Sequence, residues 1–288
     1  TDSELQVNED DTQIHIKGRE FAYTIDRRTA LFTEMKFAGR EYLNHPMELN
    51  IWRAPTDNDM YIKAEWKKAH YDKAYTRAYT TEVVQGKHGV KIVSHASVVA
   101  ETVQKILDVT ITWKIDASGK IDADIEATKD GEFPDLPRFG VRMFLDKKLS
   151  DARYFGMGPQ ESYRDKHQAA SHGLYRANVG DLHEDYIRPQ ENGSHYDCEY
   201  VELNNSRYGI VASAEKAFSF NASYYTQEEL EKKTHNYELI ESDSVVFCVD
   251  YALNGIGSNS CGPVVLEQYR FDDVLFRFQF TLIPYVKG

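Results

Sequence analysis

The chain has 288 residues and a mass of 33.2 kDa, with 41% hydrophobic, 12% aromatic and 28% charged residues. These proportions are typical of a soluble globular protein and exclude a disordered, collagenous or coiled-coil chain. No apolar run approaches the roughly 20 residues of a membrane-spanning helix. Because 46 acidic residues outnumber 34 basic ones, the net charge is −12, and this charge repels phosphate backbones. We therefore expect neither nucleic acid nor a membrane as a partner.

The cysteines and the first residues of the chain give information on the cellular compartment of the protein. Cys198, Cys248 and Cys261 are too few for a disulfide framework and lack the spacing of metal ligands. A single disulfide between two of them is the alternative. The first residues show no signal peptide, which favours a cytoplasmic location; the periplasm is the alternative if the chain belongs to a longer one. Because no linker divides the sequence, we expect residues 1–288 to form a single domain, with residues 1–11 as a flexible leader.

Apolar and polar residues alternate along much of the chain, as in β-strands with one buried face. The alternating runs lie at residues 21–25, 107–115, 121–125, 139–145, 218–224, 245–251 and 276–282. The second and third runs flank the turn at residues 116–119 and predict an antiparallel hairpin. About fifteen to twenty short strands in one undivided chain predict an all-β fold in which large antiparallel sheets pack face to face.

Helical patterns are scarce. Thr226 and Glu229 form a capping box, which predicts a short helix that continues to about residue 233. A second short helix is expected within residues 60–74, where apolar positions are mixed with charged ones. The stretch 156–195 has little periodicity but many aromatic and ionisable residues, so we interpret it as a packed functional surface and not a linker.

The first candidate site is the run Arg53-Ala-Pro-Thr-Asp57-Asn58-Asp59. The two aspartates could ligate a hard cation or act as paired carboxylates. Alternatively, an Asx-rich turn caps the following helix and Arg53 neutralises it. Because the glycine and the distal glutamate of a calcium loop are missing, we favour the turn.

Three later segments also carry candidate chemistry. Residues 156–163 contain the glycines of a phosphate loop, but no Lys-Ser/Thr pair follows them, so we expect a tight turn. Glu191 and His195 flank an Asn-Gly turn and could act as base and acid in opening a sugar ring, although a structural hydrogen-bonding role is favoured. The small-residue loop 255–263 could approach a ligand closely. Its Cys261 has no basic neighbour in the local run to lower the pKa of the thiol, which argues against a nucleophile.

Five segments together resemble the C-terminal domain of the large bacterial β-galactosidases of glycoside hydrolase family 2, which some relatives carry as a separate small chain. They occur in the family's order and span the chain from about Ile14 to Pro284. The segments are Arg53–Asp59, Tyr154–Tyr163 with the nearby Asp165, Tyr186–Gly193, Phe220–Leu230 and Gly255–Pro263.

The resemblance implies a supersandwich fold like that of galactose mutarotase. It also implies a domain that completes the sugar pocket and packs on a catalytic barrel. The barrel of the parent enzyme would supply the catalytic glutamates together with magnesium and a monovalent cation. That parent, a homo-oligomer, would hydrolyse terminal β-D-galactosides such as lactose with retention. This chain itself would then contain no catalytic residue, metal or cofactor.

The resemblance also implies roles for individual residues. In part of the family the last motif carries a tryptophan that stacks on the sugar, and here Cys261 stands at or near its place. Substrate contacts are therefore expected from Asn259, Ser260 and Cys261. A structural or pocket-rim role is expected for the remaining motif residues, which are Arg53, Asp57, Asn58, Asp59, Glu161, Glu191 and His195.

Two alternatives remain beside this interpretation. One is a free-standing aldose epimerase or mutarotase that uses Glu191 and His195. The other is a carbohydrate-binding module without chemistry. Fold alone does not separate the three hypotheses. The β-galactosidase interpretation further predicts an exposed apolar and aromatic patch on one face, where the barrel would dock.

Overall fold

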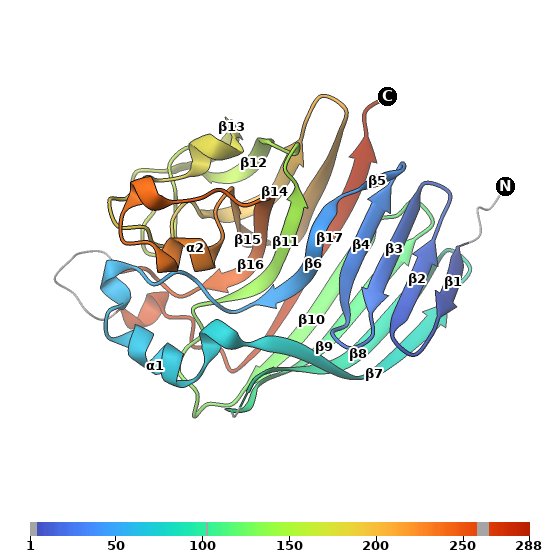
Figure 1. Cartoon of the computed structure of the whole chain (residues 1–288), viewed down its shortest axis with the longest axis horizontal. Helices are drawn as coiled ribbons and strands as arrows, with labels where there is room; N and C mark the ends of the chain where they lie inside the picture. The colour runs from blue at the N-terminus through green and yellow to red at the C-terminus, as the bar shows by residue number, and fades with distance from the viewer. Residues whose placement is uncertain (1–4, 102, 258–264) are drawn as a thin grey trace.

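The computed structural model describes residues 5–101, 103–257 and 265–288. Most of these residues belong to strands of two antiparallel sheets (Figure 1). The smaller sheet has the strand order β1-β2-β3-β4-β5. Its strands are β1 (Gln6–Glu9), β2 (Gln13–Lys17), β3 (Phe21–Asp26), β4 (Leu31–Phe37) and β5 (Arg40–Glu41). The flexible leader expected over residues 1–11 is wrong for residues 6–9, because their backbone pairs with β2 as strand β1.

The larger sheet contains twelve strands in the described part of the chain. Its main path runs β13 (Ser171–Asn178), β12 (Asp151–Gly158), β14 (His195–Asn204), β15 (Tyr208–Ser223), β17 (Leu275–Val286), β10 (Ile121–Lys129), β9 (Val103–Asp116), β8 (Gly89–Ala100) and β7 (Tyr75–Gln85). The long strand β15 branches, because its first half pairs with β17 and its second half with β16 (Ser244–Leu253). Strand β16 continues to β11 (Arg138–Asp146), and β11 to β6 (Leu43–Asn50).

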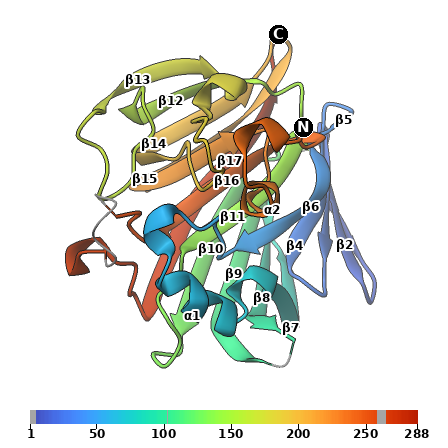
Figure 2. The ribbon, with the colours of Figure 1, turned by 60° about the vertical axis from the view of Figure 1, so that its left-hand side comes forward.

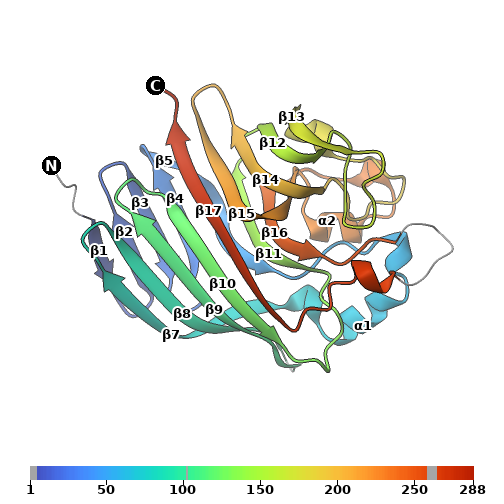
Figure 3. The same ribbon diagram turned by 180° about the vertical axis from the view of Figure 1, so that it is seen from behind.

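The smaller sheet packs on the half of the larger sheet that contains β7 to β10 and β17 (Figures 1 and 3). Aromatic side chains join the two layers: the rings of Phe32 and Trp113 meet edge to face with centroids 4.8 Å apart. The indole of Trp113 also donates to the carbonyl of Ala30 at 2.8 Å, so its polar atom is satisfied inside the core. The predicted hairpin is confirmed, since β9 and β10 pair antiparallel across the turn at residues 116–119.

Strands β11 and β16 are buried along nearly their whole length. Sequence alternation predicts one polar face for these strands, but most of their polar residues lie inside the protein. Arg138 on β11 and Asp250 on β16 are among them, with exposures of 1% and 0%. Buried charges must be paired, and this pair belongs to the network described below. Cys198 on β14 and Cys248 on β16 are buried free thiols.

The described residues contain two short α-helices, α1 (Ile62–Lys68) and α2 (Gln227–Lys232). Helix α2 begins as predicted, because the Thr226 hydroxyl accepts from the backbone N–H of Glu229 at 3.1 Å. Helix α1 is shorter than the predicted stretch 60–74, because His70 adopts φ = 60°, which a right-handed helix does not allow. Short 3-10 helices lie at Asp57–Asp59, Tyr71–Lys73, Val179–Leu182, Asn236–Glu238 and Glu267–Tyr269. Neither α-helix of the described ranges has the length and apolarity to span a membrane.

The stretch 156–195, in which the sequence shows little periodicity, contains the end of β12 and all of β13 (Figure 2). Strand β13 is the edge of the larger sheet, and its side chains alternate only between exposed and half-buried. An edge strand with so little burial gives no apolar alternation, which explains why its sequence does not predict it. The all-β prediction of large antiparallel sheets with one or two short helices is otherwise confirmed.

Candidate functional site

The motif at residues 53–59 folds back on itself after strand β6. The guanidinium of Arg53 donates to both carboxylate oxygens of Asp59, from Nη2 at 2.8 Å and from Nε at 3.2 Å. The same carboxylate accepts from the backbone N–H of Thr56 at 2.9 Å. This confirms the capped turn neutralised by Arg53. Asp59 is fully engaged, whereas Asp57 is exposed and Asn58 is half-buried.

Arg53 also reaches the segment that begins the last motif. Its Nη2 donates to the carbonyl of Gly255 at 3.1 Å, and its Nη1 donates to the carbonyl of Asn254. These carbonyls follow strand β16 and lie about 200 positions after Arg53 in the sequence. The hydrogen bonds therefore form only when the chain is folded. A charge-assisted pair of hydrogen bonds to the backbone fixes the direction in which the chain leaves the strand.

Asp165 holds the next two residues of that segment. Its Oδ1 accepts from the backbone N–H of Ile256 at 3.0 Å, and its Oδ2 accepts from that of Gly257 at 2.9 Å. The approach is close enough that a Cβ on Gly255 would lie 2.6 Å from Asp165 Oδ2. Gly257 has φ = 82°, a left-handed conformation that favours glycine. We refer to the side chains of Arg53 and Asp165 and the backbone of residues 254–257 as the stem clamp.

The predicted sugar-contacting residues Asn259, Ser260 and Cys261 lie outside the described residues. The structure therefore describes how the first half of their loop is anchored. This anchoring brings together the first, second and last of the five motifs.

Glu161 joins the second motif to the third. Its Oε2 accepts from the backbone N–H of Gly193 at 2.8 Å, and its Oε1 accepts from Lys166 Nζ at 2.8 Å and from the hydroxyl of Tyr186. The carboxylate is thus a buried structural acceptor.

Glu191 joins the third motif to the fourth. Its Oε1 accepts from the Tyr163 hydroxyl and from Asn221 Nδ2, both at 3.3 Å, and its Oε2 lies 3.5 Å from Arg138 Nη1. Burial raises the pKa of the Glu191 carboxyl, and the positive charge of Arg138 opposes that shift. Arg138 also pairs with Asp250, which makes these three residues one buried ionic cluster.

His195 lies in a different environment from Glu191. Its Nδ1 is 3.0 Å from the carbonyl of Met157, and its ring packs against Tyr154 and Phe220 with centroids 4.5 and 5.1 Å away. Burial lowers the pKa of His195 to about 4, so the ring is neutral at pH 7. Within the described chain the two side chains share no hydrogen bond. Each group therefore has its own buried partners, and the hypothesis of an acid–base pair stays a prediction.

Sequence reasoning missed Arg138, Asp250 and Asn221. A signal was present for the first two, because Arg138 begins a strand of mainly apolar residues and Asp250 lies inside another. A charge in that position must find a partner on a neighbouring strand. The described residues contain no group of three or more His, Cys, Asp or Glu side chains arranged to hold a metal ion.

The chain is similar to proteins of a known family. The sequence profile of the family described as "Beta galactosidase small chain" matches residues 17–282. The chain belongs to the β-galactosidase small-chain family. This small-chain protein is 44% identical over 281 residues to a β-galactosidase of Actinobacillus pleuropneumoniae and 32% identical over 282 residues to one of Staphylococcus xylosus. In both comparisons the match covers 98% of this chain but only 28% of the relative.

Solved structures add information on the fold of the small chain. A galactose 1-epimerase from Lactobacillus acidophilus NCFM covers 99% of this chain and 100% of its own, with a TM-score of 0.54 and 9% identity. A protein of glycosyl hydrolase family 38 from Enterococcus faecalis gives a TM-score of 0.50 at 6% identity, covering 95% of this chain and 30% of its own. These likenesses confirm the mutarotase-like sandwich and carry no information on activity.

Proposed function

We propose that this small chain completes the sugar pocket of a β-galactosidase and packs on the enzyme's catalytic barrel. The parent enzyme, a homo-oligomer of glycoside hydrolase family 2, would hydrolyse terminal β-D-galactosides with retention. The observation that carries the proposal is the stem clamp. Arg53 and Asp165 come from two separate motifs and together fix four consecutive backbone groups at the base of a third.

Such anchoring suits a loop that must present side chains to a substrate. A backbone that is held in place before the ligand arrives lowers the entropy cost of ordering the loop on binding. The clamp uses charged side chains on backbone groups, and these bonds are stronger than neutral ones. The proposed sugar contacts, Asn259, Ser260 and Cys261, begin two positions after the last clamped residue, Gly257.

The surface beside the clamp supports docking of a partner domain. Met60, Tyr61 and Leu266 are 66%, 64% and 61% exposed, although all three are large and apolar. Tyr61 and Val265, the neighbour of Leu266, line the same cavity of about 280 Å³. Exposed apolar side chains that gather in one place mark interaction surfaces. The sequence-based expectation of such a patch fits this surface, and we propose that the barrel covers it.

The chemistry of hydrolysis is assigned to the barrel domain. A retaining glycosidase needs two carboxylates about 5 Å apart across the scissile bond, one as nucleophile and one as acid and base. Here Asp59, Glu161 and Glu191 are instead engaged in structural hydrogen bonds. We propose that the barrel domain also holds the magnesium and the monovalent cation. The small chain would shape the pocket without taking part in bond cleavage.

The test is hydrolysis of a chromogenic β-galactoside by the small chain alone, by the barrel-containing remainder alone, and by the two together. We expect no activity from the small chain alone and a gain in activity on mixing. Activity of the small chain alone would contradict the proposal, because the catalytic carboxylates would then lie within these residues. A remainder that is fully active alone and unchanged on mixing would also contradict it.

The epimerase alternative has a separate readout. A mutarotase changes the optical rotation of freshly dissolved galactose faster than solvent does. Because Glu191 and His195 are buried in separate environments, we expect no acceleration by the small chain. A module that only binds carbohydrate would leave the activity of the mixed enzyme unchanged.

A further inference from the structure

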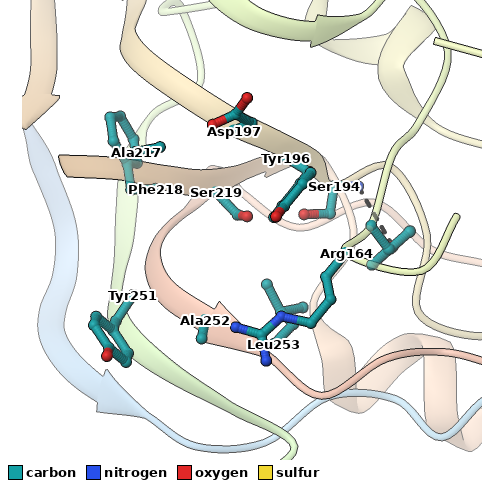
Figure 4. Close-up of a pocket in the computed structure, with 11 residues that line it drawn as sticks. Arg164, Ser194, Tyr196, Asp197, Ala217, Phe218, Ser219, Tyr251, Ala252 and Leu253 are labelled. Carbon is teal, nitrogen blue, oxygen red and sulfur yellow. Dashed lines mark hydrogen bonds between the residues drawn. The ribbon is translucent and has the colours of Figure 1, made fainter. Parts of the chain in front are cut away.

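A small polar pocket lies where the first residues of β14 meet the second half of β15 and the end of β16. Its volume is about 150 Å³. The residues that carry the argument are Arg164, Ser194, Tyr196, Ser219 and Tyr251, and Figure 4 shows them around the opening. None of them belongs to the residues predicted from sequence to contact sugar.

The pocket exists because the β14–β15 ladder is interrupted. Cys198 pairs with Phe218 and Tyr200 with Ser213, so one residue of β14 faces the four residues 214–217 of β15. Asp197, beside this bulge, has φ = 56°, which is unusual for a residue with a side chain. Bulges and strained residues redirect side chains and are frequent at functional sites.

The hydroxyl groups of the pocket are available for a ligand. In Figure 4 the hydroxyls of Ser194, Tyr196 and Ser219 lie close together on one side. Among the described residues the hydroxyls of Tyr196 and Ser219 have no hydrogen-bond partner, and that of Ser194 makes one long bond of 3.4 Å. A hydroxyl both donates and accepts, so the group matches a ligand that does the same.

A guanidinium and an aromatic ring face these hydroxyls. Arg164 donates from Nη1 to the carbonyl of Arg270 at 3.0 Å and forms no ion pair with a carboxylate of the described residues. Its other N–H groups can donate to ligand oxygens. Tyr251 adds an aromatic ring to the wall, and its hydroxyl donates to Asp273 at 3.0 Å. Aromatic side chains with a few placed polar groups are typical of small-molecule sites.

The charges favour a neutral ligand over an anion. Arg164 is one positive group, whereas Asp197 lines the pocket and the carboxylate of Asp273 accepts the hydrogen bond from the Tyr251 hydroxyl. The whole chain carries a net charge of −12, which repels anions further. At about 30 Å³ per water molecule the volume has room for about five waters, so it takes part of one hexose ring and excludes anything larger than a single sugar unit.

We infer that this pocket binds one hexopyranose unit, with the three hydroxyls and Arg164 as hydrogen-bonding groups and Tyr251 as an apolar wall. The site belongs to the small chain and needs no group from the barrel. It lies beside the stem clamp, because Arg164 is the neighbour of Asp165. Nothing in the pocket supplies an acid–base pair, so binding without chemistry is expected.

The test is calorimetric titration of the 288-residue chain alone with D-galactose, methyl β-D-galactoside, lactose and inorganic phosphate, with protein-observed NMR for weak binding. We expect saturable binding of galactose and of its methyl glycoside with similar millimolar affinity. Binding of lactose alone would overturn the one-ring site, because it would require a larger pocket. Binding of phosphate alone would overturn the assignment in favour of an anion site.

Two substitutions locate the site. Tyr196→Phe removes one hydroxyl and keeps the ring that stacks on His167, and Ser219→Ala removes a second hydroxyl. Each should weaken binding by about fivefold or more, the effect of losing one hydrogen bond. Tyr237→Phe at an exposed position serves as control and should bind normally. Unchanged affinity in both pocket variants, or no binding by the parent chain, would overturn the inference. Because no barrel is present, these results are independent of the proposed role in hydrolysis.

Discussion

Arg138 and Asp250 face each other on neighbouring buried strands and form two parallel hydrogen bonds, Nε to Oδ1 at 3.2 Å and Nη2 to Oδ2 at 2.8 Å. The same guanidinium lies 3.5 Å from the carboxylate of Glu191, which accepts hydrogen bonds from Tyr163 and Asn221. The pair therefore links the buried strands β11 and β16 to the third and fourth motifs, which contain Glu191 and Asn221. Its removal tests how much of the site depends on the core.

We expect Arg138→Met to destabilise the chain by about 3–5 kcal/mol, because Asp250 and Glu191 would be left buried without a cation. The measurement is the free energy of unfolding in urea. Arg277 forms a similar two-bond pair with Asp124 on the sheet surface, where the arginine side chain is 53% exposed. Arg277→Met is thus a matched control and should destabilise the chain far less, because exposed ion pairs contribute little to stability. Equal losses in the two variants would contradict the structural role of the buried pair.

Asp165→Asn tests the stem clamp. The amide replaces one acceptor oxygen by a donor that faces a backbone N–H, and it removes the negative charge. In the assembled enzyme, kcat/KM for a chromogenic galactoside should fall about tenfold, equivalent to about 1.4 kcal/mol. The exposed Asp181→Asn is the control, with no expected change. Full activity of Asp165→Asn would show that clamping of residues 256 and 257 is unimportant for the reaction.

Gly255→Ala perturbs the same clamp without changing its charges. The added methyl group would lie 2.6 Å from Asp165 Oδ2 and 2.8 Å from the side chain of Val265, so the segment must shift. We expect a loss of kcat/KM similar to that of Asp165→Asn. Gly131→Ala is the matched control, because nothing lies within 4 Å of its added methyl group. If both glycine variants behave alike, the close packing around residue 255 has no functional role.

His195 predicts a pH dependence of stability. Its pKa is lowered from 6.5 to about 4 by burial, so the unfolded chain takes up this proton more readily than the folded one. The stabilisation from the neutral ring is present above pH 6.5 and is lost as the pH falls toward 4. Between pH 7.5 and pH 5 this amounts to a loss on the order of 2 kcal/mol in the free energy of unfolding.

The measurement is urea unfolding of the parent chain and of His195→Gln at these two pH values. The variant should lose less stability than the parent between pH 7.5 and pH 5. His88→Gln, at an exposed position, should behave like the parent. The same pH dependence in His195→Gln and in the parent would contradict the assignment of this proton uptake to His195.

Strands that are buried on one face could be predicted from the sequence. Ile121, Ala123 and Ile125 alternate with polar residues, and they pair with the equally alternating β9. Alternation gives no signal in the edge strand β13, whereas in β11 and β16 it locates the strands but wrongly predicts a polar face, because both are almost fully buried. The helix at residues 227–232 was predictable because a cap is a local signal, whereas the early end of α1 depends on one residue, His70.

The site was predictable as a set of segments but not as an arrangement. The motifs identified the right regions, yet nothing in Asp165 indicates that its partners are the N–H groups of Ile256 and Gly257. Such contacts join residues 91 and 92 positions apart and arise only from the topology. The pocket beside Tyr196 and Ser219 depends on a register shift between two strands, which composition and periodicity do not encode.

The span of the stem clamp has a consequence for the order of events during synthesis. The bond from Arg53 to Asn254 joins residues separated by 201 positions. Contacts of such long range form slowly, because a large loop must close first. Until the residues after β16 have been added, the guanidinium of Arg53 has, among the described residues, only the early partners Asp59 and the ring of Trp66. The anchoring of Asn254 and Gly255 by Arg53 is therefore completed only after these residues have been synthesised, and a chain released before that point would contain the turn at residues 53–59 without the segment that it binds.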